Sequence, residues 1–174
     1  MIICDTGPLV AAAIVDDAFH RQAVDLLTSL HLSGEHILVP ATVAAEVGYL
    51  LGRGRNAERE AQFLESMADG TLTPVELTTT DYRRAGELVH QYADLPLGTT
   101  DATVIALCER LNLRQVATLD RRHFTVVRRD TWRRSTCCRN FGTENRNARA
   151  QKRCRERDGF PLRSEGHLLH RSQR

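Results

Sequence analysis

Four acidic residues of this sequence lie where the binding crevice of an α/β protein would form. Asp5 ends an apolar run at the N-terminus, and Asp120 ends the run VATLD. Asp101 lies at the start of the helical pattern TTDATVIALCERLNL, and Glu46 lies among apolar residues in VAAEVGYLL. Parallel strands end along one edge of a sheet, where the following helices begin. We therefore expect the four carboxylates to converge on that edge.

Carboxylates that converge without basic partners need a cation. Like charges close together raise one another's pKa values unless positive charge neutralises them. A site made only of oxygen ligands suits Mg²⁺ or Mn²⁺ rather than zinc. Such an ion can activate a water and stabilise the charge of a phosphoryl group during transfer. The four acids therefore predict hydrolysis of a phosphodiester.

Each acid also has an ordinary structural interpretation. Asp5 and Asp120 could cap the helices that follow them. Asp101 suits the positive end of a helix dipole, and Glu46 could be a surface acid of its helix. The shared position at strand ends and helix starts is what favours a common site.

The elements that must position these acids follow from hydrophobic periodicity. Short strands are predicted at residues 1–5, 36–40, 71–77, 115–120 and 124–128. Helices are predicted at residues 9–14, 41–52, 56–70, 81–95 and 99–113, with a longer helix after Asp16-Asp17 that runs through Leu30. Pro74 places the third strand at an edge of the sheet. The alternation predicts an α/β fold with a mainly parallel sheet and helices on both faces.

The charge is distributed unevenly along the chain. Residues 1–130 carry 12 arginines against 18 acids, a net charge of −6. Residues 131–174 carry 11 arginines, one lysine and four acids, a net charge of +8. Few core-forming residues occur in this second segment, so it cannot offset its ordering entropy. We expect one domain at residues 1–130, followed by a disordered, basic tail at residues 131–174.

The sequence also predicts a cytoplasmic protein without membrane attachment. Apolar stretches such as residues 9–15 are far shorter than the roughly 20 residues of a membrane span. No basic region precedes the first apolar run, so no signal peptide is expected. Of the five cysteines, Cys4 and Cys108 lie in apolar runs and are predicted to be core residues rather than disulfide partners.

Four segments of the sequence resemble the motifs of PIN-domain ribonucleases, and of VapC-type toxins of VapBC toxin–antitoxin systems in particular. They are IICDTGPLVA, VAAEVGYLL, LGTTDATVIALCERL and VATLDRRHFTVVR, in the family's order and spacing over about residues 1–130. The resemblance implies a three-layer α/β/α sandwich and a Mg²⁺- or Mn²⁺-dependent endoribonuclease that cuts an RNA substrate. It also implies a homodimer and a cognate VapB-like antitoxin as inhibitor.

The resemblance also assigns roles to individual residues. The family's catalytic acidic quartet corresponds to Asp5, Glu46, Asp101 and Asp120. Asp5 and Asp101 would be the principal metal ligands, and the hydroxyls of Thr6 and Thr99 would support the site. The number of metal ions and the RNA that is cut stay open.

Other functions fit the sequence less well. A catalytically inactive PIN-like domain that only binds RNA or a protein partner is the main alternative, and the presence of all four acids argues against it. Phosphatases of the haloacid dehalogenase type and receiver domains use a lysine beside their acids. The only lysine here is Lys152, which lies in the basic tail.

The tail departs from the resemblance, because VapC-type domains end near residue 130. It could be an RNA-binding arm, since arginines contact phosphates without reading sequence. It could instead be a frameshifted or read-through end without a selected role. The ratio of 23 arginines to one lysine indicates a GC-rich coding sequence and favours the second interpretation.

Overall fold

The structure describes most of residues 1–130, the segment with a net charge of −6. The computed structural model describes residues 1–53, 57–95, 97–120, 124, 127 and 137–139. The chain divides into two units, Met1–Gly142 and Thr143–Arg174, and every described residue belongs to the first.

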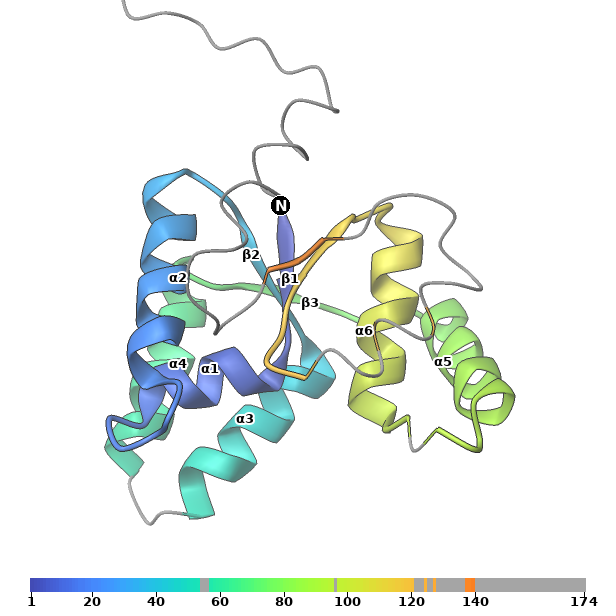
Figure 1. Ribbon diagram of the computed structural model, residues 1–174, viewed down its shortest axis with the longest axis horizontal. Coiled ribbons are helices and arrows are strands. Elements are labelled where there is room, and N and C mark those ends of the chain that lie inside the picture. Colours follow the sequence, from blue (N-terminus) through green and yellow to red (C-terminus); the bar gives the residue numbers. More distant parts are fainter. Residues whose placement is uncertain (54–56, 96, 121–123, 125–126, 128–136, 140–174) are drawn as a thin grey trace, which may run out of the picture. The chain divides into compact units, whose positions relative to one another are not determined.

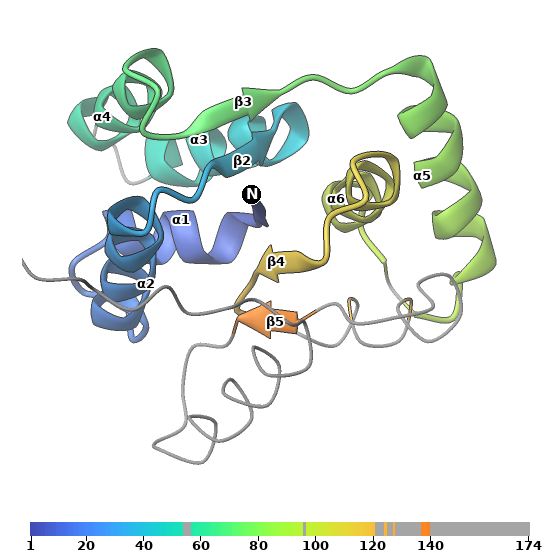
Figure 2. The same ribbon diagram turned by 90° about the horizontal axis from the view of Figure 1, so that it is seen from above.

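The first unit is built on a parallel sheet. Its five strands are β1 (Ile2–Cys4), β2 (Ile37–Pro40), β3 (Thr73–Val75), β4 (Gln115–Ala117) and β5 (Cys137–Arg139). They lie in the order β3-β2-β1-β4-β5, and every neighbouring pair is parallel (Figure 2). The mainly parallel sheet is therefore confirmed. Pro74 lies in the edge strand β3, as predicted, where a missing N–H is tolerated.

The central strands are buried on both sides. In β1, the consecutive residues Ile2 and Ile3 are each fully buried, although their side chains point to opposite faces of the sheet. Ile3 pairs with Leu38 of β2 and Val116 of β4. Unbroken apolar runs of this kind are typical of parallel strands covered by helices on both faces.

Six helices within the described residues supply that cover. They are α1 (Thr6–Ala13), α2 (His20–Leu32), α3 (Ala41–Arg53), α4 (Ala57–Ala68), α5 (Thr79–Gln91) and α6 (Thr99–Arg110). Helices α1 to α4 lie on one side of the sheet, and α5 and α6 lie on the other (Figures 1 and 2). The predicted three-layer α/β/α arrangement is thus confirmed. Among the described residues, no helix combines the length and apolar composition needed to cross a membrane.

The crossovers place three helix starts at one edge of the sheet. Helix α1 follows β1 directly, and α3 follows β2 directly. Helix α6 runs back toward the start of β4, so it begins at the edge where β1 and β2 end (Figure 1). This edge carries Asp5 and the first turns of α1, α3 and α6.

The predicted strand at residues 124–128 is wrong in its described part. Phe124 and Val127 have helical backbone and are buried. Residues three apart share one face of a helix, whereas in a strand they would point to opposite faces. The β-branched residues of FTVV suggested a strand, but burial of Phe124 and Val127 on one side is satisfied by a helical turn. The other residues of this segment lie outside the described residues.

The fifth strand is β5, which lies inside the range predicted to be a tail. It adds to the sheet beside β4, with Val116 paired to Cys138. The rest of residues 131–174 lies outside the described residues. The disorder predicted for this segment therefore stays a prediction. The domain boundary at residue 130 stays a prediction.

Candidate functional site

Asp5 joins the central strand to the first helix. It is the N-cap of α1, and its Oδ1 accepts a hydrogen bond of 2.7 Å from the backbone N–H of Thr6. Its Oδ2 accepts a second bond of 2.7 Å from the hydroxyl of Thr118. Only 8% of the residue is exposed. The capping interpretation is correct, yet each carboxylate oxygen keeps a lone pair that could bind a cation.

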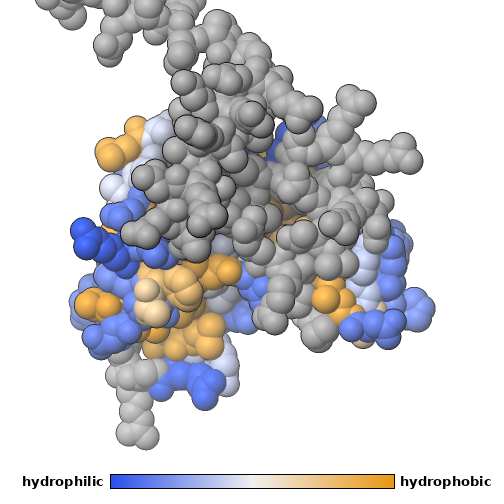
Figure 3. All heavy atoms as spheres, viewed as in Figure 1, coloured by the Kyte–Doolittle hydropathy of each residue, from blue (hydrophilic) through white to orange (hydrophobic). Residues whose placement is uncertain are grey.

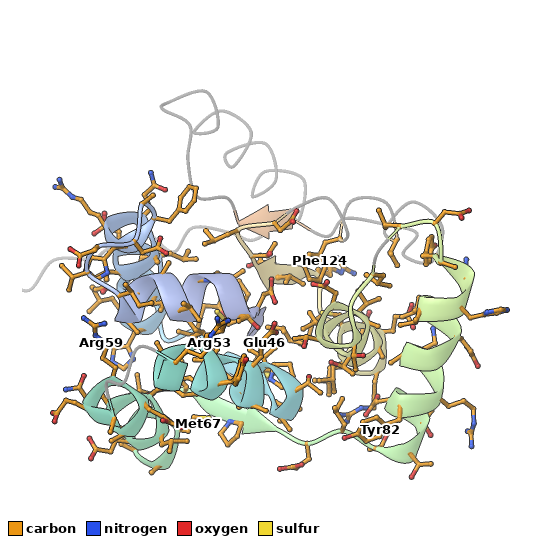
Figure 4. The ribbon with its side chains drawn as sticks, turned by 90° about the horizontal axis from the view of Figure 1, so that it is seen from below. Glu46, Arg53, Arg59, Met67, Tyr82 and Phe124 are labelled. Carbon is orange, nitrogen blue, oxygen red and sulfur yellow. The ribbon has the colours of Figure 1, made fainter. Side chains whose placement is uncertain are left out.

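Glu46 is tied to the same strand end through Thr6. The Thr6 hydroxyl donates to Glu46 Oε2 at 2.8 Å, which links α1 to α3. Glu46 is half-buried beside Val43 and Val47, which are fully buried on α3. Figure 4 shows Glu46 at the sheet edge, between the helices. Thr6 thus orients this carboxylate through a hydrogen bond, and its support of a metal site stays a prediction.

Asp101 lies over the start of α6. The N-cap of this helix is Gly98, which offers no side-chain cap, and Asp101 is the acid of the first turn. Its Oδ2 lies 3.6 Å from the position that a Cβ on Gly98 would occupy, so the carboxylate turns back over the helix start. The positive end of the helix dipole favours a negative charge there.

The three carboxylates act on one another. Burial is the main reason that the pKa of Asp5 rises to about 6, and the charges of Asp101 and Glu46 raise it further. The hydrogen bonds from Thr118 and Thr6 oppose that rise. Asp5, Glu46 and Asp101 therefore form one negatively charged cluster, called the acidic pocket, at the end of β1 and on α3 and α6.

The backbone of Asp120 is linked to Asp5 through a threonine that sequence reasoning missed, and a place for its carboxylate among the other acids stays a prediction. Thr118 is buried, donates to Asp5, and accepts a bond of 3.1 Å from the backbone N–H of Asp120. Asp120 is half-buried and follows β4. A polar residue in the buried run VATLD was the signal that could have identified Thr118, because buried hydroxyls are almost always bonded.

The threonines at the start of α6 differ in their surroundings, and the supporting role of Thr99 stays a prediction. Thr99 begins α6 and is exposed. Thr103 is fully buried, and its hydroxyl lies 2.6 Å from that of Thr42 on α3. This hydrogen bond joins the first turn of α3 to α6, and so connects the helices that carry Glu46 and Asp101.

The donor set fits a hard divalent cation. The acids of the pocket offer oxygen ligands, and burial with mutual repulsion makes ionised Asp5 costly without a counter-charge. Within the described part of the chain, no group of three or more His, Cys, Asp or Glu side chains is arranged to hold a metal ion. Magnesium does not require one, because it usually binds one or two carboxylates and keeps several waters.

Comparisons with known proteins agree with this architecture. The family model described as PIN domain matches residues 2–129. Ribonuclease VapC26 of Mycobacterium tuberculosis is 28% identical over 127 residues, which cover 73% of this chain and 92% of that protein. The family suggested by the sequence motifs is therefore confirmed.

Two solved structures share the fold. VapC20 of Mycobacterium tuberculosis, described as a sarcin–ricin loop cleaving toxin, aligns with a TM-score of 0.64 and 18% identity. The alignment covers 72% of this chain and 95% of VapC20. VapBC2 of Rickettsia felis, solved bound to a DNA fragment from its promoter, aligns with a TM-score of 0.58 and 18% identity over 82% of this chain and 100% of that one.

Proposed function

Because this chain belongs to the PIN-domain family, we propose that it is a divalent-metal-dependent endoribonuclease of the VapC toxin type. The observation that carries the proposal is the mutual interaction of Asp5, Glu46 and Asp101 at the edge where β1 and β2 end. A buried carboxylate beside two partly buried ones is costly without a cation, so this arrangement supports a functional role.

The residues of the pocket have distinct roles in this proposal. Asp5 and Asp101 hold Mg²⁺ or Mn²⁺, and Glu46 and Asp120 complete the pocket directly or through water. The bound ion supplies an activated water and neutralises phosphate charge. Thr6 orients Glu46, and Thr118 orients Asp5.

The charge of residues 1–130 supports the proposed requirement for a cation. Residues 1–130 have a net charge of −6, so this segment without a cation repels the polyanionic RNA backbone. The pocket concentrates that negative charge where the scissile phosphate would lie. A divalent ion held by these carboxylates would offset their negative charge, so that the phosphate would be attracted instead of repelled.

A toxin of this type has an antitoxin partner, and we propose a VapB-like one, together with a homodimeric toxin acting in the cytoplasm. Hydrophobic side chains gather over α1 (Figure 3). Val10, Ala13 and Ile14 are partly buried there, and Val15 is 67% exposed. An apolar helix surface beside an active site suits an amphipathic segment of an inhibitor.

Cleavage of RNA by the purified chain tests this function. We expect cleavage with Mg²⁺ and none with a chelator, and a rate at least ~100-fold lower in Asp101→Asn, because the variant loses an electrostatic group of the pocket. Asp25→Asn, an exposed acid on α2, is the matched control and should keep the wild-type rate. A sarcin–ricin loop RNA is the first substrate to try, because VapC20 is described as cleaving it. Equal rates for Asp101→Asn and the wild type would contradict the proposal.

A further inference from the structure

We propose that Tyr49 and Arg53, on the outer turns of α3, form a binding subsite for single-stranded RNA beside the acidic pocket. A base stacks on the Tyr49 ring, and a neighbouring phosphate pairs with the Arg53 guanidinium. The inference rests on the proposed function and extends it, because it assigns residues that hold the strand next to the bond that is cut.

The position of the pair follows from helix geometry. Tyr49 and Arg53 lie three and seven residues after Glu46 on α3, spacings that put all three on one side of the helix. Their distances from Glu46 along the axis are about 5 and 10 Å. Helical side chains lean toward the N-terminus, and so toward Glu46. Figure 4 shows Glu46 and Arg53 along the same side of α3.

The pair has the form of a stacking platform. Tyr49 is 65% exposed, although aromatic rings normally contribute to stability by being buried. The guanidinium carbon of Arg53 lies 5.7 Å from the centre of the Tyr49 ring. This cation–π contact holds the ring and the charge together at the surface. Aromatic rings with adjacent arginines are the features that bind single-stranded nucleic acids without reading sequence.

The positive charge of Arg53 favours the binding of RNA, whose phosphates are negatively charged. Arg53 places a positive charge close to an acidic pocket, in a domain segment with a net charge of −6. A strand whose scissile phosphate lies at the carboxylates would therefore meet a favourable protein charge on α3. The ordinary role of Arg53 is to stabilise the C-terminal end of α3 through the helix dipole. If that were its only role, substitution of Arg53 would not change the affinity of the protein for RNA.

Binding measurements separate the two roles. The probe is a fluorescent single-stranded RNA, bound in Mg²⁺ to the full chain carrying Asp101→Asn so that cleavage does not interfere. In that background we expect Tyr49→Leu to weaken binding roughly 5- to 150-fold, the range of one base–aromatic stack. Tyr82→Leu is the matched control, because Tyr82 is 56% exposed on α5, away from Glu46 (Figure 4).

Removal of single bases from the RNA gives the decisive result. One abasic position should weaken binding to the Tyr49-containing protein but have no further effect on Tyr49→Leu, because both changes remove the same stack. Arg53→Gln should lower the salt dependence of binding by about 0.7 in the log–log slope, the value for one phosphate contact on a single strand. Arg83→Gln, an exposed arginine on α5, should leave that slope unchanged.

The inference is overturned if Tyr49→Leu and Tyr82→Leu bind RNA equally well, which would leave the pair to a protein partner. It is also overturned if the abasic effect persists in Tyr49→Leu. Neither result depends on cleavage. Failure of the proposed nuclease activity would instead appear in the cleavage assay, with RNA binding through Tyr49 and Arg53 intact.

Discussion

The structural role of Asp5 supports the role of metal ligand that we propose for it. As the N-cap of α1 it is fixed by hydrogen bonds from Thr6 and Thr118, so its carboxylate has one orientation. The same burial that fixes the carboxylate makes its negative charge costly, and Asp101 and Glu46 increase that cost. A fixed and buried carboxylate of this kind is suited to binding a cation, because the positive charge offsets the energetic cost of ionising it.

The raised pKa of Asp5 predicts how stability depends on pH without metal. Its folded value of about 6 lies above the unfolded value of about 3.9. The folded state therefore binds the proton more tightly, and this contribution to stability is lost as the pH rises through about 6. With chelator present, we expect the free energy of unfolding to fall by up to about 3 kcal/mol between about pH 4 and about pH 7.

Denaturant unfolding of the wild type and of Asp5→Asn checks this expectation. The Asn amide can accept from the Thr6 N–H and donate to the Thr118 oxygen, while the Thr118 hydroxyl turns to the carbonyl of Asp120, 3.0 Å away. The variant should therefore be more stable than the metal-free wild type at neutral pH. Mg²⁺ should stabilise the wild type alone. A variant that is less stable at every pH would show that ionised Asp5 is not costly.

Thr118 predicts a separate effect on activity. Thr118→Val keeps the shape of the side chain but removes the donor to Asp5 and the acceptor for the Asp120 N–H. Loss of a group that orients a metal ligand typically costs about 10- to 100-fold in metal affinity or activity. We expect a higher Mg²⁺ concentration for half-maximal cleavage. Thr118→Ser should restore it, and failure of Ser to do so would assign the loss to packing.

At the scale of elements, α6 is held from two sides. Thr103 bonds to Thr42 of α3 on one side. On the other, Arg84 of α5 donates from Nε and Nη2 to the Glu109 carboxylate at 2.7 and 3.1 Å. Arg110 of α6 donates to Asp81 of α5 at 2.9 Å. The helix that carries Asp101 is thus fixed against its neighbours by polar contacts as well as by its apolar core.

Asp81 stabilises both α5 and the contact between α5 and α6. It forms a capping box with Thr78 and pairs with Arg110, and it is only 2% exposed. Burial opposes its ionisation, but the hydrogen bonds from Thr78 and the Arg110 charge hold its pKa below the usual value. We expect Asp81→Asn to lower the free energy of unfolding by about 1.5–3 kcal/mol at neutral pH.

The contribution of Asp81 to the free energy of unfolding changes with pH in the opposite direction to the contribution of Asp5. A lowered pKa gives stability above the unfolded pKa, and this stability disappears as the pH falls through the folded value. The difference between the wild type and Asp81→Asn should therefore shrink in acid. Glu87→Gln is the control, because Glu87 pairs with Arg84 at the surface and should change stability by less than about 1 kcal/mol. A constant difference at all pH values would argue against the ion pair.

At the scale of the whole molecule, β5 raises the question of where the domain ends. The strand pairs with β4 over Gln115, Val116 and Ala117, and the first unit extends to Gly142. Without β5, β4 would be an edge strand with unpaired backbone groups. The boundary proposed at residue 130 would remove this strand, and a boundary at residue 142 would keep it.

Truncation distinguishes these boundaries. We expect a chain of residues 1–142 to unfold at the same denaturant concentration as the full chain, and a chain of residues 1–130 to unfold earlier, because β4 loses its partner. Equal midpoints for both truncations would support the boundary at residue 130. RNA affinity measured on the same proteins separates the two interpretations of the tail. An RNA-binding arm predicts weaker salt-dependent binding once the arginines after residue 142 are lost, and an end without a selected role predicts unchanged binding.

The sequence by itself determined the order and type of most elements. Apolar runs such as IIC and ILVP predict buried strands, and the strand-helix alternation predicts a parallel sheet with helices on both faces. From that topology it follows that Asp5, Asp101 and Asp120 lie near the strand-end edge. These inferences succeed because they depend on local periodicity and on chain connections.

The tertiary structure decided which side chains meet. Thr118 reaches Asp5 across 113 positions of the chain, and Thr42 reaches Thr103 across 61. The helical backbone of Phe124 and Val127 likewise depends on burial against the core rather than on the β-branched residues between them. Contacts of this kind depend on packing distances of a few ångströms between distant segments, and no local pattern in the sequence encodes them.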